Sequence, residues 1–184
     1  MKDDYGMRLS SLDFGCGRGR CGHLLRTFSA FLCGIDLFTP SLTTAQNTST
    51  YDALIRADLS SSLPFKDRVF DLAVGFEVLE HLSKDDGMTL LSEIERVTRT
   101  IIILSTPNIW KQKLDVAEHD RNAFMKHKSI WSVAELKKRG YEVHGIGLKG
   151  HKQIDMWALL TWKMPVFSKR LFAWKTLGEH KCTS

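Results

Sequence analysis

Three glycines follow the first apolar segment of the chain, and a carboxylate follows the second. Gly15, Gly17 and Gly19 come directly after a run that ends at Phe14, and Asp36 closes the run over 30–35. Glycine lets the backbone turn sharply and lets a ligand lie against bare main chain. A carboxylate at the end of the next strand can accept hydrogen bonds from a ribose. The first 36 residues therefore predict a site for a nucleoside-containing cofactor.

These glycines fit two different patterns. G-x-G-x-x-G is met by Gly17, Gly19 and Gly22 and is typical of dinucleotide-binding enzymes. D-x-G-x-G-x-G begins at Asp13 and runs to Gly19. The carboxylate makes the second pattern the more specific one. Later segments of the sequence are needed to distinguish the two patterns.

The segment 57–82 favours the second pattern. It reads A-D-L-S-S-S-L-P-F-K-D-R-V-F-D-L-A-V-G-F-E-V-L-E-H-L. Together with the glycine loop it resembles the class I S-adenosylmethionine (SAM)-dependent methyltransferases, in the branch that modifies lipid-, quinone- or sugar-like small molecules. The resemblance covers about residues 9–108, with a weaker similarity from His127 onward in H-K-S-I-W-S-V-A-E-L-K-K-R-G-Y-E-V. It implies SAM as the cofactor, S-adenosylhomocysteine (SAH) as its product and an unidentified small-molecule acceptor.

The resemblance also implies which residues hold the cofactor. The glycine loop would contact the methionine part of SAM, Asp36 the ribose hydroxyls and Asp58 the adenine amino group. Asp13 is expected to brace the loop. The predicted cofactor site consists of Asp13, Gly15, Cys16, Gly17, Gly19, Asp36, Leu37, Ala57, Asp58, Leu59, Phe76 and Glu77. Three plainer interpretations stay open: Asp36 as a surface acid at a strand end, Asp58 as a turn former, and Glu77 as a helix-cap partner.

Glu77 and His81 are the catalytic candidates, although His81 is as well explained as a packed structural histidine. Methyl transfer needs a general base only when the acceptor loses a proton. The lack of an evident catalytic dyad in the sequence therefore does not argue against methyltransferase activity. His119, His127 and Trp131 are predicted to contact the acceptor from a loop over 107–130 and its end. The two histidines are eight residues apart and have no cysteine partners, so no metal site is expected.

Two other functions remain as alternatives. A non-catalytic SAM-binding partner protein would carry the same motifs. An NAD(P)-dependent reductase is less favoured, because no tyrosine is followed four residues later by a lysine, as in the short-chain reductases.

Composition indicates one globular domain over 1–184, with 43% hydrophobic and 26% charged residues. The longest apolar runs are far shorter than a membrane span, and the N-terminus does not resemble a signal peptide. The four cysteines lack metal-ligand spacing. We expect them to stay reduced in a cytoplasmic protein.

The net charge of +5 is confined to the end of the chain. Residues 149–184 contain seven Lys and Arg against two Asp and Glu, together with three of the five tryptophans. The favoured interpretation is that the apolar side chains cover the sheet while the lysines are solvated. Contact of this segment with a membrane surface is the second interpretation, and binding of nucleic acid is the least favoured. The sequence does not indicate an oligomeric state.

Alternating strand-like and helical segments predict an α/β, Rossmann-like three-layer sandwich. Its sheet is expected to be mostly parallel, with six or seven strands and helices on both faces. Strands are predicted over 9–14, 31–35, 53–57, 69–75, 100–105, 141–148 and, at the sheet edge, 170–177. Helices are predicted over 19–28, after an N-cap at Thr39, over 84–99, from Ser132 to Gly140 with a Ser132–Glu135 capping box, and over 156–167.

Overall fold

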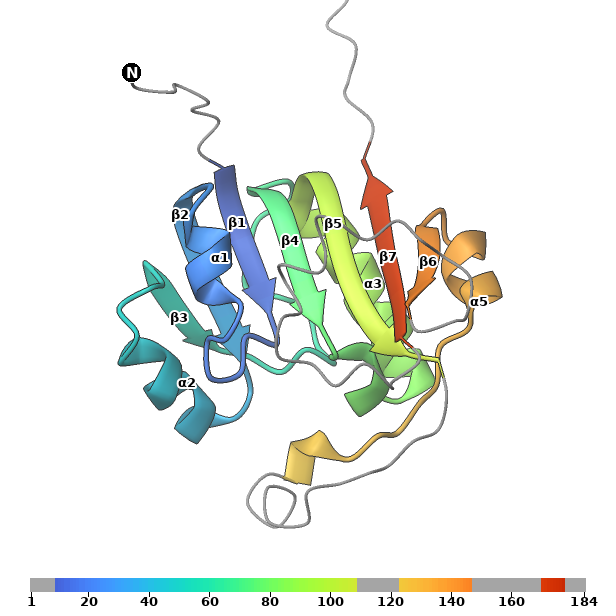
Figure 1. The fold of residues 1–184 in the computed structure, drawn as a ribbon, viewed down its shortest axis with the longest axis horizontal. Coiled ribbons are helices and arrows are strands. Elements are labelled where there is room, and N and C mark those ends of the chain that lie inside the picture. The colour runs from blue at the N-terminus through green and yellow to red at the C-terminus, as the bar shows by residue number, and fades with distance from the viewer. Residues whose placement is uncertain (1–8, 109–122, 147–169, 178–184) are drawn as a thin grey trace, which may run out of the picture.

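Seven strands form one sheet in the computed structural model, which describes residues 9–108, 123–146 and 170–177 (Figure 1). Their order is β3-β2-β1-β4-β5-β7-β6. The strands are β1 (Leu9–Phe14), β2 (Ser29–Asp36), β3 (Ala53–Arg56), β4 (Phe70–Phe76), β5 (Thr98–Pro107), β6 (Glu142–Ile146) and β7 (Arg170–Thr176). Only β7 runs antiparallel to its neighbours in the described sheet. The predicted α/β class with a mostly parallel, seven-stranded sheet is confirmed.

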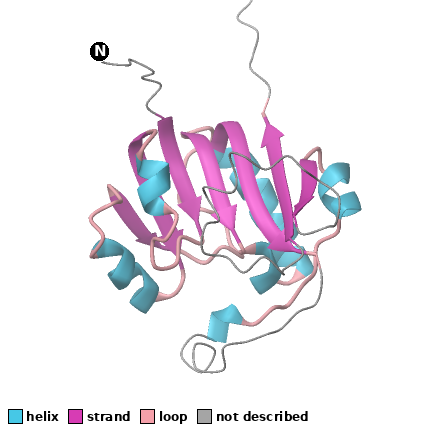
Figure 2. Ribbon diagram, viewed as in Figure 1, coloured by secondary structure: helices cyan, strands magenta, loops and turns pink. Residues whose placement is uncertain are grey.

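Helices cover both faces of the sheet (Figure 2). They are α1 (Gly22–Arg26), α2 (Thr39–Gln46), α3 (Lys84–Val97) and α5 (Val133–Lys138), with short 3-10 turns η1 (Leu79–His81) and η2 (Ala123–Met125). The larger core joins α3 and α5 to one face through side chains such as Leu91, Ile94 and Leu136. On the opposite face Leu25 of α1 packs with Leu32 and Val74. Among the described helices, none is long and apolar enough to cross a membrane.

The first two helices differ from their predicted limits. The helix expected over 19–28 is only α1, because Gly19 has a φ of +79° and cannot belong to a right-handed helix. Phe28 accepts a hydrogen bond from the amide of Leu9, so the chain has already turned into the sheet by that point. The N-cap of α2 is Phe38, not Thr39, because the Phe38 carbonyl accepts from the amides of Ser41 and Leu42.

Later elements follow the predictions more closely, with one topological error. The capping box of Ser132 and Glu135 is present at the start of α5. The last strand is not at the edge, because β7 lies between β5 and β6 and leaves β6 outermost. The hydrophobic pattern alone could not show this, because buried residues such as Leu171 and Ala173 are compatible with an inner strand and with an edge strand. The helix predicted over 156–167 lies outside the described residues.

The topology brings the ends of distant segments to one edge of the sheet. Strands β1 to β5 are parallel, so all five end at the lower edge in Figure 1. Arg170, the first residue of β7, pairs with Pro107 at the end of β5 and therefore starts from the same edge. Open α/β sheets bind their ligands at this carboxyl edge.

Candidate functional site

The glycine loop leaves β1 in a conformation that only glycine adopts without strain. Gly15 and Gly17 have φ values of +70° and +53°. A Cβ on Gly15 would lie 2.5 Å from Cγ2 of Val78, whereas a Cβ on Gly17 would meet no heavy atom within 4 Å. Gly15 therefore serves close packing of the loop on the segment after β4. Gly17 borders open space, as a backbone that receives a ligand must.

Asp36 ends β2 and faces this loop. Its Oδ2 accepts from the amide of Gly17 at 2.9 Å, and its Oδ1 accepts from the amide of Phe38 at 2.8 Å. The side chain is half-buried. A carboxylate oxygen can accept more than one hydrogen bond, so both oxygens keep acceptor capacity for hydroxyl donors. Asp36 thus fixes the loop and the start of α2, and it stays accessible at the carboxyl edge.

Asp13 lies beneath the loop and is almost completely buried, at 3% exposure. The hydroxyl of Tyr51 donates to its Oδ2 at 2.7 Å. Burial raises the pKa of Asp13 to about 7, an effect that the Tyr51 hydrogen bond opposes and the charge of Asp36 reinforces. Of the predicted site residues, Asp13 therefore occupies the bracing position and offers no exposed oxygen to a ligand.

The end of β3 supplies the next part of the predicted site. Asp58 is exposed, and its Oδ1 accepts from both the amide and the hydroxyl of Ser60, at 2.9 and 2.7 Å. This is the turn-forming arrangement that the sequence left open. The amide of Ala57 donates to the carbonyl of Asp36, which ties this turn to the end of β2, and Leu59 is buried. Contact of Asp58 with adenine stays a prediction.

Glu77 follows β4 in a strained conformation with a φ of +58°. Its Oε1 accepts from the hydroxyl of Ser105 and its Oε2 from Nε of Arg170, both at 2.8 Å. Ser105 lies on β5 and Arg170 on β7, so residues from two strands fix this carboxylate. Next to it, the half-buried ring of Phe76 lies 6.1 Å from that of Phe172. Sequence reasoning missed Arg170, because its partner is 93 residues away in the chain.

Glu80 and His81 come three and four residues after Glu77, on η1. Glu80 is 1% exposed, and the hydroxyl of Thr106 donates to its Oε2 at 3.1 Å. Burial, followed by the charge of Glu77, raises the pKa of Glu80. The ring of His81 lies edge-on to that of His127, with centroids 5.1 Å apart. The structure thus brings together two predicted residues and one, Glu80, that the sequence analysis did not single out.

Comparisons with known proteins agree with this geometry. Residues 12–101 match the family model described as a methyltransferase domain. This match covers slightly less than half of the chain. Malonyl-acyl-carrier-protein O-methyltransferase of Buchnera aphidicola subsp. Baizongia pistaciae is 32% identical over 100 residues, which are 53% of this chain and 39% of that protein. The match therefore spans well under half the length of this curated relative.

Solved structures share the fold of this chain at low sequence identity. A SAM-dependent methyltransferase from Archaeoglobus fulgidus superposes with a TM-score of 0.66 at 14% identity, over 94% of this chain and 88% of that one. Magnesium protoporphyrin IX methyltransferase from Synechocystis PCC 6803, solved with bound SAH, gives 0.59 at 19% identity, over 94% and 77%. These similarities support the fold.

The structure places two of the residues that were predicted to contact the acceptor, His127 and Trp131. His127 is half-buried beside His81. Trp131 is 1% exposed in the larger core, and its Nε1 donates to the carbonyl of Leu79 at 3.3 Å. The prediction that Trp131 contacts the acceptor is therefore corrected to a packing role, because the indole has no exposed face.

Other predictions fall outside what the structure describes. His119 lies outside the described residues, as does most of the basic segment 149–184. Within that segment Leu171, Phe172 and Ala173 are buried as part of the sheet itself, in β7, and Lys175 pairs with Glu95. The prediction that the segment covers the sheet while its lysines are solvated is otherwise not tested by the described residues. Membrane-surface contact stays a prediction.

Proposed function

We propose that this protein is an enzyme that binds SAM and transfers its methyl group to a small-molecule acceptor. The observation that carries the proposal is the pairing of Asp36 with the glycine loop. The carboxylate is held by the Gly17 amide at 2.9 Å, next to a loop backbone that borders open space. A ribose with two hydroxyl donors suits this carboxylate, and bare main chain suits the methionine moiety of the cofactor.

The charges at this edge favour SAM over a dinucleotide. Asp36, Asp58 and Glu77 all follow strands that end here, so the region carries several carboxylates. SAM is a sulfonium cation, whereas the pyrophosphate of NAD is an anion that binds best at a helix N-terminus with few acids nearby. Carboxylates therefore support SAM binding.

The bound cofactor would supply an electrophilic methyl group with a neutral thioether as leaving group. The residues of this chain would contribute mainly by orientation, since alignment supplies much of the acceleration of a displacement reaction. Asp36 would hold the ribose, and the loop amides would hold the amino-acid end of the cofactor. Glu77, fixed by Ser105 and Arg170, would place a negative charge near the sulfonium.

For the acceptor, the relatives provide a direction. Malonyl-acyl-carrier-protein O-methyltransferase and magnesium protoporphyrin IX methyltransferase are both named for acceptors that are not nucleic acids. From these names we carry over only that the acceptor is not a nucleic acid; the proposed lipid-, quinone- or sugar-like class comes from the resemblance of the sequence motifs.

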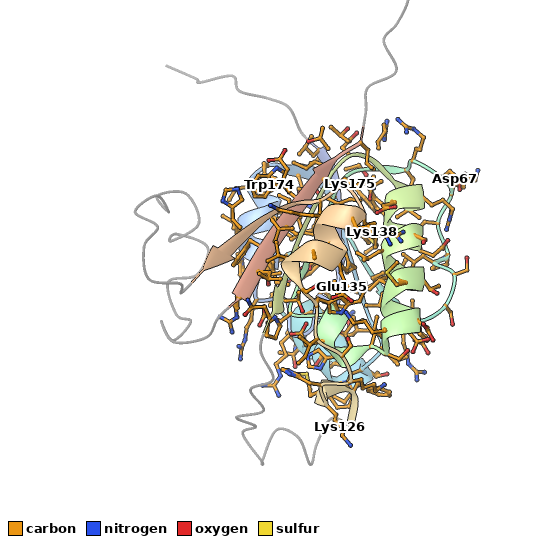
Figure 3. All side chains as sticks on the ribbon, turned by 90° about the vertical axis from the view of Figure 1, so that its right-hand side faces the viewer. Asp67, Lys126, Glu135, Lys138, Trp174 and Lys175 are labelled. Atoms are coloured by element: carbon orange, nitrogen blue, oxygen red, sulfur yellow. The ribbon has the colours of Figure 1, made fainter. Side chains whose placement is uncertain are left out.

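Calorimetric titration with SAH tests the cofactor assignment. We expect Asp36→Ala to weaken SAH binding at least about tenfold, because hydrogen bonds to a charged acceptor are lost. Asp67→Ala is the matched control: Asp67 is an exposed carboxylate at the opposite, upper edge of the molecule (Figure 3). Equal SAH affinity in Asp36→Ala and in the unmodified protein would contradict the proposal. Binding without turnover over a broad acceptor screen would favour the non-catalytic alternative.

A further inference from the structure

We propose that Glu80, His81 and His127 bind a divalent transition-metal cation at the acceptor side of the cofactor site. Each of the three residues offers one ligand atom, and these atoms all lie within 4.8 Å of one another. Two imidazoles and one carboxylate are a common donor set for zinc, iron, manganese or cobalt. A cation of ordinary size can bridge such a group after small side-chain adjustments.

The three ligands are held together from two distant parts of the chain. Glu80 and His81 belong to η1, whereas His127 is 46 residues further along. The amides of Lys128 and Ser129 donate to the carbonyl of Glu80 at 2.7 and 3.2 Å. These bonds fix the residue after His127 against the residue before His81.

Two side chains strengthen the same junction. The hydroxyl of Ser129 donates to the carbonyl of Leu79 at 3.0 Å, and Nε1 of Trp131 donates to the same carbonyl. The indole of Trp131 fits so closely over α3 that a Cβ on Gly87 would lie 2.5 Å from it. The segment that carries His127 is therefore anchored in the core, which gives the site the rigidity that a metal centre requires.

The carboxylate of the site is also oriented. Glu80 is 1% exposed, and Thr106 on β5 donates to its Oε2. Buried carboxylates in proteins are usually paired with a cation or coordinate a metal. Arg170 donates through its Nε to Glu77, and its positive charge also acts on Glu80. Thr106 thus acts as a partner of the ligand rather than as a ligand, a role known to tune metal affinity.

The position of the site suggests what the cation would do, and this step rests on the proposed methyl transfer. η1 directly follows β4 and Glu77, and three protein ligands leave coordination positions open. An acceptor hydroxyl bound there would be polarised beside the methyl donor. Its proton would pass to solvent, and an oxygen lone pair would form the new O–C bond with the methyl carbon. The electron pair of the broken C–S bond would stay on sulfur. The acceptor class would then be an oxygen nucleophile.

Titration of the full chain with cobalt(II), without SAM or acceptor, tests the metal site. Cobalt serves as the probe because its visible absorption distinguishes nitrogen and oxygen ligands from thiolates. We expect one cation per chain, and an affinity at least about tenfold weaker in each of Glu80→Gln, His81→Gln and His127→Gln. His144→Gln is the control, since His144 is an exposed histidine on β6 that stacks on Trp174. Thr106→Val should weaken binding about tenfold without removing a ligand.

Several results would overturn this inference. Absence of cobalt binding would do so, as would thiolate absorption bands, which would place the metal on a cysteine. Equal affinities in His127→Gln and His144→Gln would show that Glu80, His81 and His127 form only a hydrogen-bonded cluster. Far-ultraviolet circular dichroism of each variant verifies that it is folded. SAH titration of the same samples separates the two proposals: an unmodified protein that binds SAH but not cobalt would overturn the metal site alone.

Discussion

Asp13 shows how a residue in a cofactor motif can serve the fold rather than the ligand. Its pKa is raised to about 7, chiefly by burial, from an ordinary value of 3.8. Its buried neutral form therefore stabilises the fold fully below pH 4. That contribution disappears as the pH rises towards 7, because the unfolded chain loses the proton first. A residue that braces the loop thus makes folding sensitive to pH.

We expect Asp13→Asn to remove this pH dependence. Asn keeps a carbonyl that can accept from the Tyr51 hydroxyl, as Oδ2 of Asp13 does. Between pH 4 and 7 the free energy of unfolding of the unmodified protein should fall relative to the variant, by on the order of a few kcal/mol. Urea unfolding at a series of pH values measures it, with Asp67→Asn as control. A constant difference between Asp13→Asn and the unmodified protein would refute the assignment.

Glu77 combines a strained backbone with a carboxylate that two side chains hold. We expect Glu77→Gly to be about 1 kcal/mol more stable than Glu77→Ala, because glycine adopts the φ of +58° without strain. Urea unfolding of the two variants checks this. Both variants should lose more turnover than SAM affinity, measured with labelled SAM and an acceptor found by screening. Equal losses would reduce Glu77 to a structural partner of Arg170.

At the scale of elements, the loop after β1 places a closely packed glycine, Gly15, and an openly bordered one, Gly17, within three residues. Gly15→Ala should destabilise the protein by about 1–3 kcal/mol more than Gly17→Ala, since its Cβ would collide with Val78. Gly17→Ala meets no atom within 4 Å and should cost only about 1 kcal/mol through its positive φ. We nevertheless expect at least about tenfold weaker SAH binding for Gly17→Ala.

Thermal unfolding and SAH calorimetry of the two glycine variants measure the predicted differences in stability and in SAH affinity. A Gly17→Ala protein with unchanged SAH affinity would mean that the open space beside Gly17 does not receive the cofactor. Val78→Ala added to Gly15→Ala should restore part of the lost stability, because it removes the atom that the new Cβ meets.

The elements could largely be predicted from the sequence because their signals are local. The apolar segment that ends at Phe14 before the glycines located β1, and the Ser132–Glu135 pair located the start of α5. The errors arose where a specific side-chain hydrogen bond or a long-range strand pairing decides the conformation. The N-cap of α2 depends on the carboxylate of Asp36, which holds the amide of Phe38. The inner position of β7 depends on β6 pairing beyond it, which no local pattern reports.

At the scale of the whole molecule, the topology brings together, at one edge of the sheet, segments that are far apart in the sequence. Asp36 and the glycine loop were predictable because each lies next to a strand end. The neighbourhood of His81 and His127 was not, since it depends on the docking of Ser129 and Trp131 onto Leu79. Sequence spacing had paired His127 with His119 instead, and therefore pointed away from a metal site.

The melting temperature of the protein should rise only with a ligand that the folded protein binds, and it can therefore identify the cofactor. A ligand that binds only the folded state at one hundred times its dissociation constant adds about 2.7 kcal/mol. For a chain of this length each kcal/mol raises the melting temperature by about 2–4 °C. We expect SAM and SAH to raise it by several degrees, and NADH and NADPH to leave it unchanged. Asp36→Ala should lose most of the SAH shift, whereas Asp67→Ala should keep it. A shift with NADH or NADPH but none with SAH would favour the reductase alternative and overturn the proposed function.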